Sequence, residues 1–393
     1  MKKKRIASID VFRALTMLLM VFVNDLWTVH GVPPWLEHAS ATADAMGFAD
    51  TIFPAFLFLV GLSLPFALEN RMTRGESRGK LFLHILLRSL ALIIMGFFQM
   101  NLENYSHQAM LPRSIWEIVI TVAFFLIWLD YSPRLQQSKK WLQILGVLML
   151  VFAAIVYQGE TNGQLVWMQP HWWGILGLIG WAYFACATLL LFGGEKLVFL
   201  IAAFACFLVI NASARLHAPA GLWSFDQLLA RLGLGDGSNS SITMAGVIIS
   251  VLYRKWQDKP MRYTGVFLAI AAAFFLGGFM SRPLWGISKI RATPSWTLIC
   301  NGISLLAFCV LIYIVDRRGK KQWFQLIKPA GTSTLTCYLL PYLHGAIFLS
   351  LLGLRLPEGI RTGWIGIAKS LLFALAIVLV TGLLEKKRLR LKI

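Results

Sequence analysis

The chain has 393 residues, of which 58% are hydrophobic and 14% charged, and its formal net charge is +19. Soluble globular proteins carry about a quarter charged residues, so this composition excludes an ordinary soluble domain. The positive charge does not indicate nucleic-acid binding, because the basic residues stand in short segments between apolar runs. All five cysteines lie inside apolar runs, so neither a disulfide framework nor a metal site is expected.

Apolar runs of about 20 residues, each long enough to cross a bilayer as a helix, recur along the whole chain. They predict an all-α fold, a polytopic transmembrane bundle of about twelve helices. The predicted spans are 8–28, 49–69, 81–100, 114–130, 141–157, 172–192, 195–211, 242–253, 263–280, 296–315, 332–352 and 364–384. The span 242–253 is the weakest and can be extended back through Ser238.

The distribution of Lys and Arg predicts the orientation. Alternate connecting segments, starting with Lys2–Arg5, hold 26 of the 37 basic residues, whereas the others hold 8. The positive-inside rule therefore predicts that both termini are cytoplasmic. Tryptophans gather at the predicted outer edge and indicate an interfacial belt: Trp27, Trp35, Trp167, Trp172, Trp173, Trp285, Trp296 and Trp364.

Ionisable groups inside predicted spans are functional candidates. Asp10 and Arg13 share one face at the inner end of the first helix, either as an interfacial pair or as part of a site. At its outer end stand Asn24 and Asp25. The following loop carries His30, Glu37 and His38, and Asp50 opens the second helix, where it is either a helix cap or a functional group.

Lys80, His84 and Arg88 recur every four residues and predict a basic stripe running inward from the cytosol. Such a stripe suits a phosphate-bearing ligand, although pairing of Arg88 with Glu117 or Asp10 is the alternative. Other polar residues in the spans either bridge helices or line a site: Glu117, Asn301, His344 and Lys369. His107, His171 and His217 stand in outer loops and are more simply solvated.

Four motifs follow one another in the N-terminal third: Arg5-x4-Asp10-x-Phe12-Arg13-Ala14, Met20-Val21-Phe22-Val23-Asn24, His38-Ala39-Ser40, and Ala49-Asp50-x-x-Phe53-Pro54-x-Phe56-x-Phe58-x-x-Gly61. Together they resemble the heparan-alpha-glucosaminide N-acetyltransferase family of transmembrane acyltransferases. Weaker similarity continues at Ser240-Ser241-Ile242, at Lys289 with Pro294-Ser295-Trp296, and at Pro329-x-Gly331. The resemblance implies one transmembrane acyltransferase domain over 1–393 in a bacterial inner membrane, with a possible homodimer.

The family transfers an acetyl group from cytosolic acetyl-CoA to the amine of a terminal glucosamine on the far side. By resemblance, His38 matches the catalytic histidine and Asn24 the catalytic asparagine. A histidine can act as the base for the amine, an asparagine NH₂ can stabilise the oxyanion, and Asp50 can orient the imidazole. We expect acetyl-CoA to meet Lys80, His84, Arg88, Arg13 and Asp10, and the amino sugar to meet Asp25, Glu117, Lys289 and His344.

The chain departs from the animal members in several places. The spacings from Asn24 to His38 and from His38 to Asp50 are longer, so His30 stays a rival base. Residues 172–211 form an extra helix pair where those members carry an extended outer loop, and an Arg-rich stretch is reduced to Leu111-Pro112-Arg113.

Two other classes of function compete with the enzyme. An amino-sugar transporter has the same layout of about twelve helices with both ends inside. A structural membrane scaffold explains the helices but neither Arg88 nor the cluster of Asn24, His38 and Asp50.

Overall fold

The structure is a computed structural model that describes residues 6–171, 174–214 and 236–393. The basic start Lys2–Arg5, the tryptophans Trp172 and Trp173, and His217 lie outside the described residues.

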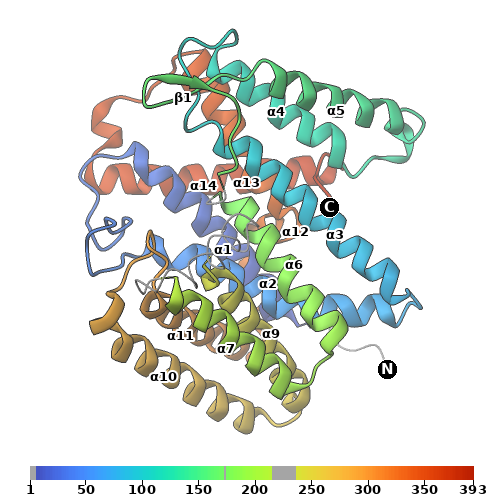
Figure 1. Cartoon of the computed structure of the whole chain (residues 1–393), viewed down its shortest axis with the longest axis vertical. Coiled ribbons are helices and arrows are strands. Elements are labelled where there is room, and N and C mark those ends of the chain that lie inside the picture. The colour runs from blue at the N-terminus through green and yellow to red at the C-terminus, as the bar shows by residue number, and fades with distance from the viewer. Residues whose placement is uncertain (1–5, 172–173, 215–235) are drawn as a thin grey trace. The chain divides into compact units, whose positions relative to one another are not determined.

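Helices make up nearly all of the regular structure (Figure 1). The α-helices are α1 (Ala7–Asp25), α2 (Ala49–Met72), α3 (Arg78–Met100), α4 (Arg113–Trp128), α5 (Lys139–Ile155), α6 (Ile175–Gly193), α7 (Leu197–Ser213), α9 (Ser238–Trp256), α10 (Pro260–Trp285), α11 (Pro294–Leu311), α12 (Lys328–Thr332), α13 (Thr334–His344) and α14 (Gly363–Lys386). Two π-helical segments follow α11 and α13, Ile312–Arg317 and Gly345–Leu351. Short 3₁₀ turns cover Leu26–Thr28, Pro133–Leu135, Trp323–Leu326 and Glu358–Arg361.

The predicted helical fold is confirmed. In the part of the chain that the structure describes, eight helical segments are long and apolar enough to cross a membrane, which indicates a multi-pass membrane protein. They are Ala7–Thr28, Ala49–Met72, Arg78–Met100, Ile175–Gly193, Pro260–Trp285, Pro294–Arg317, Thr334–Leu351 and Gly363–Lys386. The other predicted spans are helices α4, α5, α7 and α9. The number of twelve spans and the cytoplasmic termini stay predictions.

Two details differ from the sequence expectation. The predicted helix 332–352 is broken at Ser333, whose φ of −128° and ψ of 47° are not helical, and widens into a π-helix after His344. Pro341 lies within α13 and lacks the amide hydrogen that an α-helix uses for its backbone bonds. The loop 158–171, predicted to be an outer loop, contains an antiparallel hairpin of β1 (Gly159–Thr161) and β2 (Gln164–Val166), in which Gly159 pairs with Val166.

The chain divides into two compact units, each described here by itself. The first unit comprises Met1–Thr16, Pro33–Leu90 and Leu178–Trp323. The second comprises Met17–Val32, Ala91–Gly177 and Phe324–Ile393.

A close crossing of α2 and α9 forms the centre of the first unit. A Cβ atom added at Gly61 would lie 1.9 Å from the Thr243 carbonyl oxygen, and one added at Gly246 would lie 2.0 Å from that of Phe58. The two helices therefore meet backbone to backbone, and the Ser250 hydroxyl donates to the Leu62 carbonyl at 2.8 Å across the same contact. Small residues allow this approach between apolar helices.

Helix α11 packs against both α2 and α9. It also packs on α10, and α7 packs on α9, so that these helices lie side by side in Figure 1. The hydroxyls of Ser238 and Thr297 are 2.7 Å apart, which joins the start of α9 to α11. The side chain of Asn211 on α7 donates to the Ala292 carbonyl at 2.8 Å, just before α11 begins.

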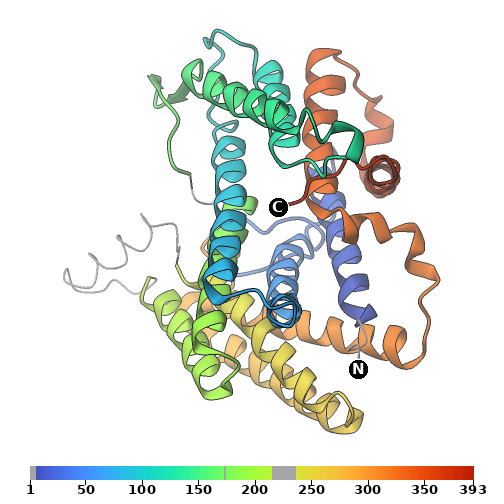
Figure 2. The same cartoon turned by 90° about the vertical axis from the view of Figure 1, so that its right-hand side faces the viewer.

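The second unit contains the antiparallel pair of α4 and α5, visible beside each other in Figure 2. Its aromatic core surrounds Trp116, which is fully buried and donates to the Ala153 carbonyl at 2.8 Å. The end of the chain is fixed by Arg390, which bonds Asp130 and Glu385 at 3.0 Å each.

We expect Gly61→Ala and Gly246→Ala each to destabilise the protein by about 1–3 kcal/mol, the usual cost of overpacking a close contact. The added methyl group must push two backbones apart at the α2–α9 crossing. The measurement is the thermal transition of the purified protein in detergent.

The matched control is Gly265→Ala in α10, where an added Cβ meets nothing within 4 Å. This change should be neutral or slightly stabilising, because alanine favours the helix. Equal losses in all three variants would contradict the close-crossing interpretation.

Candidate active site

A buried carboxylate at the start of α2 organises the preceding loop of the first unit. Asp50 is fully buried, and its carboxylate accepts hydrogen bonds from the backbone amides of Ala39 and Gly47 at 3.0 and 2.9 Å. Its Oδ1 lies 2.6 Å from Nδ1 of His38. All these partners precede the helix, so Asp50 anchors the preceding loop and does not cap α2.

The contact with Asp50 determines which ring nitrogen of neutral His38 carries the proton. To donate to the carboxylate, the imidazole carries its proton on Nδ1, which leaves the lone pair on Nε2. The His38 side chain is 43% exposed, whereas that of Asp50 is fully enclosed. A reacting group can therefore approach a histidine whose tautomer is held from behind, as a general base requires.

Helix α11 holds Asp50 in place. The indole of Trp296 donates to the Asp50 carbonyl at 3.2 Å, and the Cys300 thiol lies 3.9 Å from the same oxygen. Trp296 is only 2% exposed, so its assignment to the interfacial belt was wrong: its indole nitrogen is needed inside the protein. Other predicted belt members, such as Trp35 and Trp364, are exposed.

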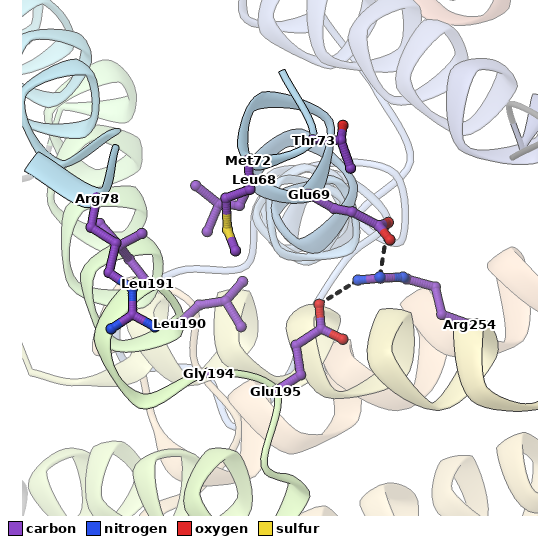
Figure 3. A pocket seen from close by; sticks show the side chains of 10 residues that line it. All are labelled: Leu68, Glu69, Met72, Thr73, Arg78, Leu190, Leu191, Gly194, Glu195 and Arg254. Carbon is purple, nitrogen blue, oxygen red and sulfur yellow. Dashed lines mark hydrogen bonds and ion pairs between the residues drawn. The ribbon is translucent and has the colours of Figure 1, made fainter. Parts of the chain in front are cut away.

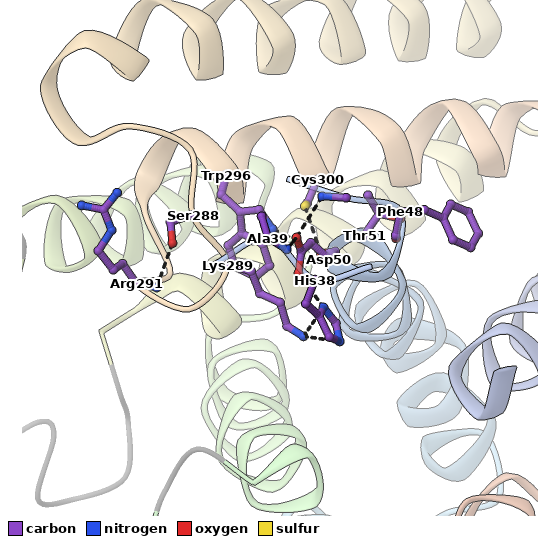
Figure 4. A network of polar contacts seen from close by, with 11 residues as sticks. His38, Ala39, Phe48, Asp50, Thr51, Ser288, Lys289, Arg291, Trp296 and Cys300 are labelled. Atoms are coloured by element: carbon purple, nitrogen blue, oxygen red, sulfur yellow. Dashed lines mark hydrogen bonds and ion pairs between the residues drawn. The ribbon is translucent and has the colours of Figure 1, made fainter. Parts of the chain in front are cut away.

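Lys289 completes the cluster from the loop between α10 and α11. Its Nζ lies 3.2 Å from Nδ1 and 3.4 Å from Nε2 of His38 (Figure 4). Burial lowers the pKa of the Lys289 ammonium below its ordinary value, and the negative charge of Asp50 opposes this shift. The structure thus brings Lys289 and His38, two residues predicted for the site, next to each other.

A clamp that the sequence did not reveal joins the loop before α2 to the end of α10 and the loop that follows it. The Asp44 carboxylate accepts from the Arg282 Nε at 2.8 Å and from the backbone amide of Ile287 at 2.6 Å. Gly286 permits the turn with φ +66°. Asp44 and Arg282 are 238 residues apart, and no local pattern marks them as partners.

Asn24, Asp25 and His30 belong to the second unit. Asn24 is exposed at the end of α1. Asp25 is engaged in an ion pair with Lys369 of α14 at 2.6 Å, and the same ammonium donates to Thr28 at 2.6 Å. The backbone of His30 bridges to Thr362.

At the other end of the first unit, Asp10 and Arg13 form the expected pair at 3.4 Å. Arg13 also donates to the Ser63 hydroxyl of α2 at 2.8 Å. Along α3, Lys80 and Arg88 are exposed and His84 is half-buried. The Arg88 guanidinium lies over the Tyr183 ring, 5.1 Å from its centre.

Three of the segments predicted to face the cytosol converge on a pocket of about 460 Å³ (Figure 3). They are 71–80, 193–196 and 254–262. Arg254 is compensated by two carboxylates in this pocket, Glu69 at 2.8 Å and Glu195. Arg78 also lines this pocket, and no ion pair compensates its guanidinium among the described residues.

The remaining candidates lie in the second unit. Glu117 is half-buried on α4. His344 stands where α13 changes to the π-helix, and its ring centre is 4.8 Å from that of Phe373. Within the described ranges, no group of three or more His, Cys, Asp or Glu residues could hold a metal ion.

Comparison with known proteins shows two relationships. Residues 5–219 match the family described as "Domain of unknown function (DUF5009)". The heparan-alpha-glucosaminide N-acetyltransferases of Homo sapiens and Mus musculus are each 34% identical to this chain over 101 residues. That stretch is 26% of this chain and only 14% of either relative.

The Asp44 clamp predicts a pH-dependent stability. The hydrogen bond from the Ile287 amide, followed by that from Arg282, lowers the pKa of Asp44 below its ordinary value. The stabilisation is therefore complete above the unfolded pKa of about 4 and is lost as the pH falls through the lower folded value. We expect Asp44→Asn to lower the melting temperature at neutral pH, and the difference from the wild type to shrink below about pH 4.

Asp258→Asn, a change in an exposed loop of the same unit, is the control and should show no such pH-dependent difference. A difference between Asp44→Asn and the wild type that stays constant down to acidic pH would rule out the clamp's contribution.

Proposed function

This chain belongs to the DUF5009 family and is related over part of its length to heparan-alpha-glucosaminide N-acetyltransferase, and from this premise we propose that it is a transmembrane acetyltransferase. It transfers an acetyl group from cytosolic acetyl-CoA to the amine of glucosamine, or of a glucosamine-terminated sugar, at the outer face. The observation that carries the proposal is the His38–Asp50 pair at 2.6 Å, with the exposed imidazole backed by a buried carboxylate.

The reaction needs a base for the acceptor amine. Nε2 of His38 takes the amine proton while the amine nitrogen attacks the thioester carbonyl, the new C–N bond forms, and the C–S bond to CoA breaks. Asp50 remains ionised and stabilises the imidazolium. The proton then passes to the CoA thiolate. The resemblance to the family assigns the role of oxyanion donor to the side-chain NH₂ of Asn24, which belongs to the second unit.

The donor enters from the cytosolic side. Its phosphates suit the basic stripe of Lys80, His84 and Arg88, together with Arg78, because Arg254 is already neutralised by carboxylates. The Arg88–Tyr183 pair offers a flat cationic and aromatic surface for a nucleobase. Asp10 and Arg13 belong to the same inner region of the donor path.

Of the residues predicted to contact the acceptor, Lys289 lies beside His38 in the first unit, and Asp25, Glu117 and His344 belong to the second unit. Asp25 is ion-paired with the Lys369 ammonium, so a sugar hydroxyl that contacts Asp25 would meet both members of this ion pair. The proposal includes twelve spans with both termini cytoplasmic, a single domain over 1–393 in a bacterial inner membrane, and a homodimer.

An amino-sugar transporter is the second candidate, favoured by one observation. The segment 328–351 is discontinuous, with a break at Ser333 and a π-helix after His344. Discontinuous helices form substrate sites in secondary transporters. Sugar counterflow in liposomes without acetyl-CoA would favour transport, whereas labelled acetyl transfer to the sugar would favour the enzyme.

We expect His38→Ala to lower the rate of acetyl transfer by about 10² or more, the usual contribution of a general base. The assay is transfer of labelled acetyl from acetyl-CoA to glucosamine by purified protein. Asp50→Asn should also lower the rate, because it loses the charge behind the imidazolium.

His30→Ala is the matched control, since His30 is an outer-loop histidine without a carboxylate partner among the described residues. Acetyl transfer by His38→Ala at the wild-type rate would contradict the assignment of His38 as the base. Loss of activity only in His30→Ala would identify His30 as the base.

Arg88→Ala should raise the KM for acetyl-CoA roughly tenfold, the value of one charge-assisted contact, with a smaller effect on kcat. Arg262→Ala is the control, because its guanidinium lies over Trp256 in another inner segment of the same unit. An unchanged KM in Arg88→Ala would reject the stripe as the donor site.

A further inference from the structure

The Lys289 side chain places a primary amine beside the base of the proposed reaction. Its Nζ contacts both ring nitrogens of His38, at 3.2 and 3.4 Å. The amine of an amino-sugar acceptor must approach the same Nε2 to lose its proton. The Lys289 amine therefore lies beside Nε2 of His38, where the amine of the acceptor must also lie.

We propose that Lys289 is a self-acetylation site: in the absence of an acceptor, its ε-amine receives the acetyl group from the acyl-CoA thioester. The inference rests on the proposed function, because it uses the same donor and the same base. It assigns a covalent modification to a loop residue that sequence analysis expected to contact the sugar.

The chemistry is balanced within the cluster. His38 Nε2 takes a proton from the Lys289 ammonium, the neutral Nζ attacks the thioester carbonyl, an amide C–N bond forms, and the C–S bond breaks. The proton lost by the attacking nitrogen protonates the CoA thiolate. The direction of the Lys289 pKa supports the first step, since burial already favours the uncharged amine.

Other lysines are less suited to this reaction. Lys369, also half-buried, has its Nζ 2.6 Å from both the Asp25 carboxylate and the Thr28 hydroxyl, so its amine is already engaged in two hydrogen bonds. Among the described lysines, only Lys289 contacts a histidine ring. Lys369 therefore serves as an internal reference for non-enzymatic acetylation.

Acetylation would close the site without unfolding it. The Asp44 clamp holds the same loop through Arg282 and the Ile287 amide, and neither contact uses Nζ. The acetyl-lysine amide is chemically stable and fills the space beside His38. The modified protein can therefore no longer transfer the acetyl group to a sugar. A bound amino sugar competes for the donor and protects Lys289.

The test incubates purified full-length protein with ¹³C-labelled acetyl-CoA, with and without glucosamine, followed by chymotryptic peptide mapping. We expect labelled Lys289 at about tenfold or more above Lys369 without glucosamine, and loss of that excess in His38→Ala and Asp50→Asn. Protection of wild-type Lys289 by glucosamine gives a readout that needs no variant. Lys289→Arg, which cannot accept the acetyl group, should not lose its own activity during preincubation with acetyl-CoA, whereas the wild type should.

The outcomes separate the two proposals. Acetylated glucosamine with unlabelled Lys289 would overturn the self-acetylation and leave the transferase standing. If Lys289 is labelled no faster than Lys369, or is labelled equally in His38→Ala, the acetylation is non-enzymatic. Either result would also overturn the self-acetylation proposal. If neither glucosamine nor Lys289 is acetylated, both proposals fall.

Discussion

The burial of one carboxylate determines the arrangement of the candidate site. Removing an ionised carboxylate from water is costly unless hydrogen bonds replace the lost solvation. Asp50 meets this requirement with two backbone amides and an imidazole, all from residues 38–47. The loop must therefore fold back over the start of α2. His38 then lies at the surface, with its Nδ1 hydrogen-bonded to Asp50.

That arrangement depends on a rigid support. The α2–α9 crossing at Gly61 and Gly246 leaves no side-chain volume between the backbones, so neither helix can slide without a steric clash. Trp296 then joins α11 to the first turn of α2. A rigid helical base carries the two loops that contain His38 and Lys289.

Local properties of the sequence predicted most of the fold, because membrane helices are marked by long apolar runs. The span predicted at 49–69 is α2 at Ala49–Met72, and even the weak 242–253 lies within α9 at Ser238–Trp256. The His38–Asp50 pair was also predictable, since the two residues stand in neighbouring motifs only 12 positions apart. The Asp44–Arg282 clamp and the burial of Trp296 were not, because each depends on a partner far away in sequence. The break at Ser333 was not predictable either, because an apolar run marks the length of a helix and not its backbone angles.

The Asp25–Lys369 pair has an electrical consequence. A single charge displaced across a membrane potential of 100 mV exchanges about 2.3 kcal/mol with the field. Two opposite charges held 2.6 Å apart move together and carry no net charge. The membrane voltage therefore does almost no work on this part of the second unit, whichever way α1 and α14 shift, and its energetics are the same in an energised and a depolarised membrane.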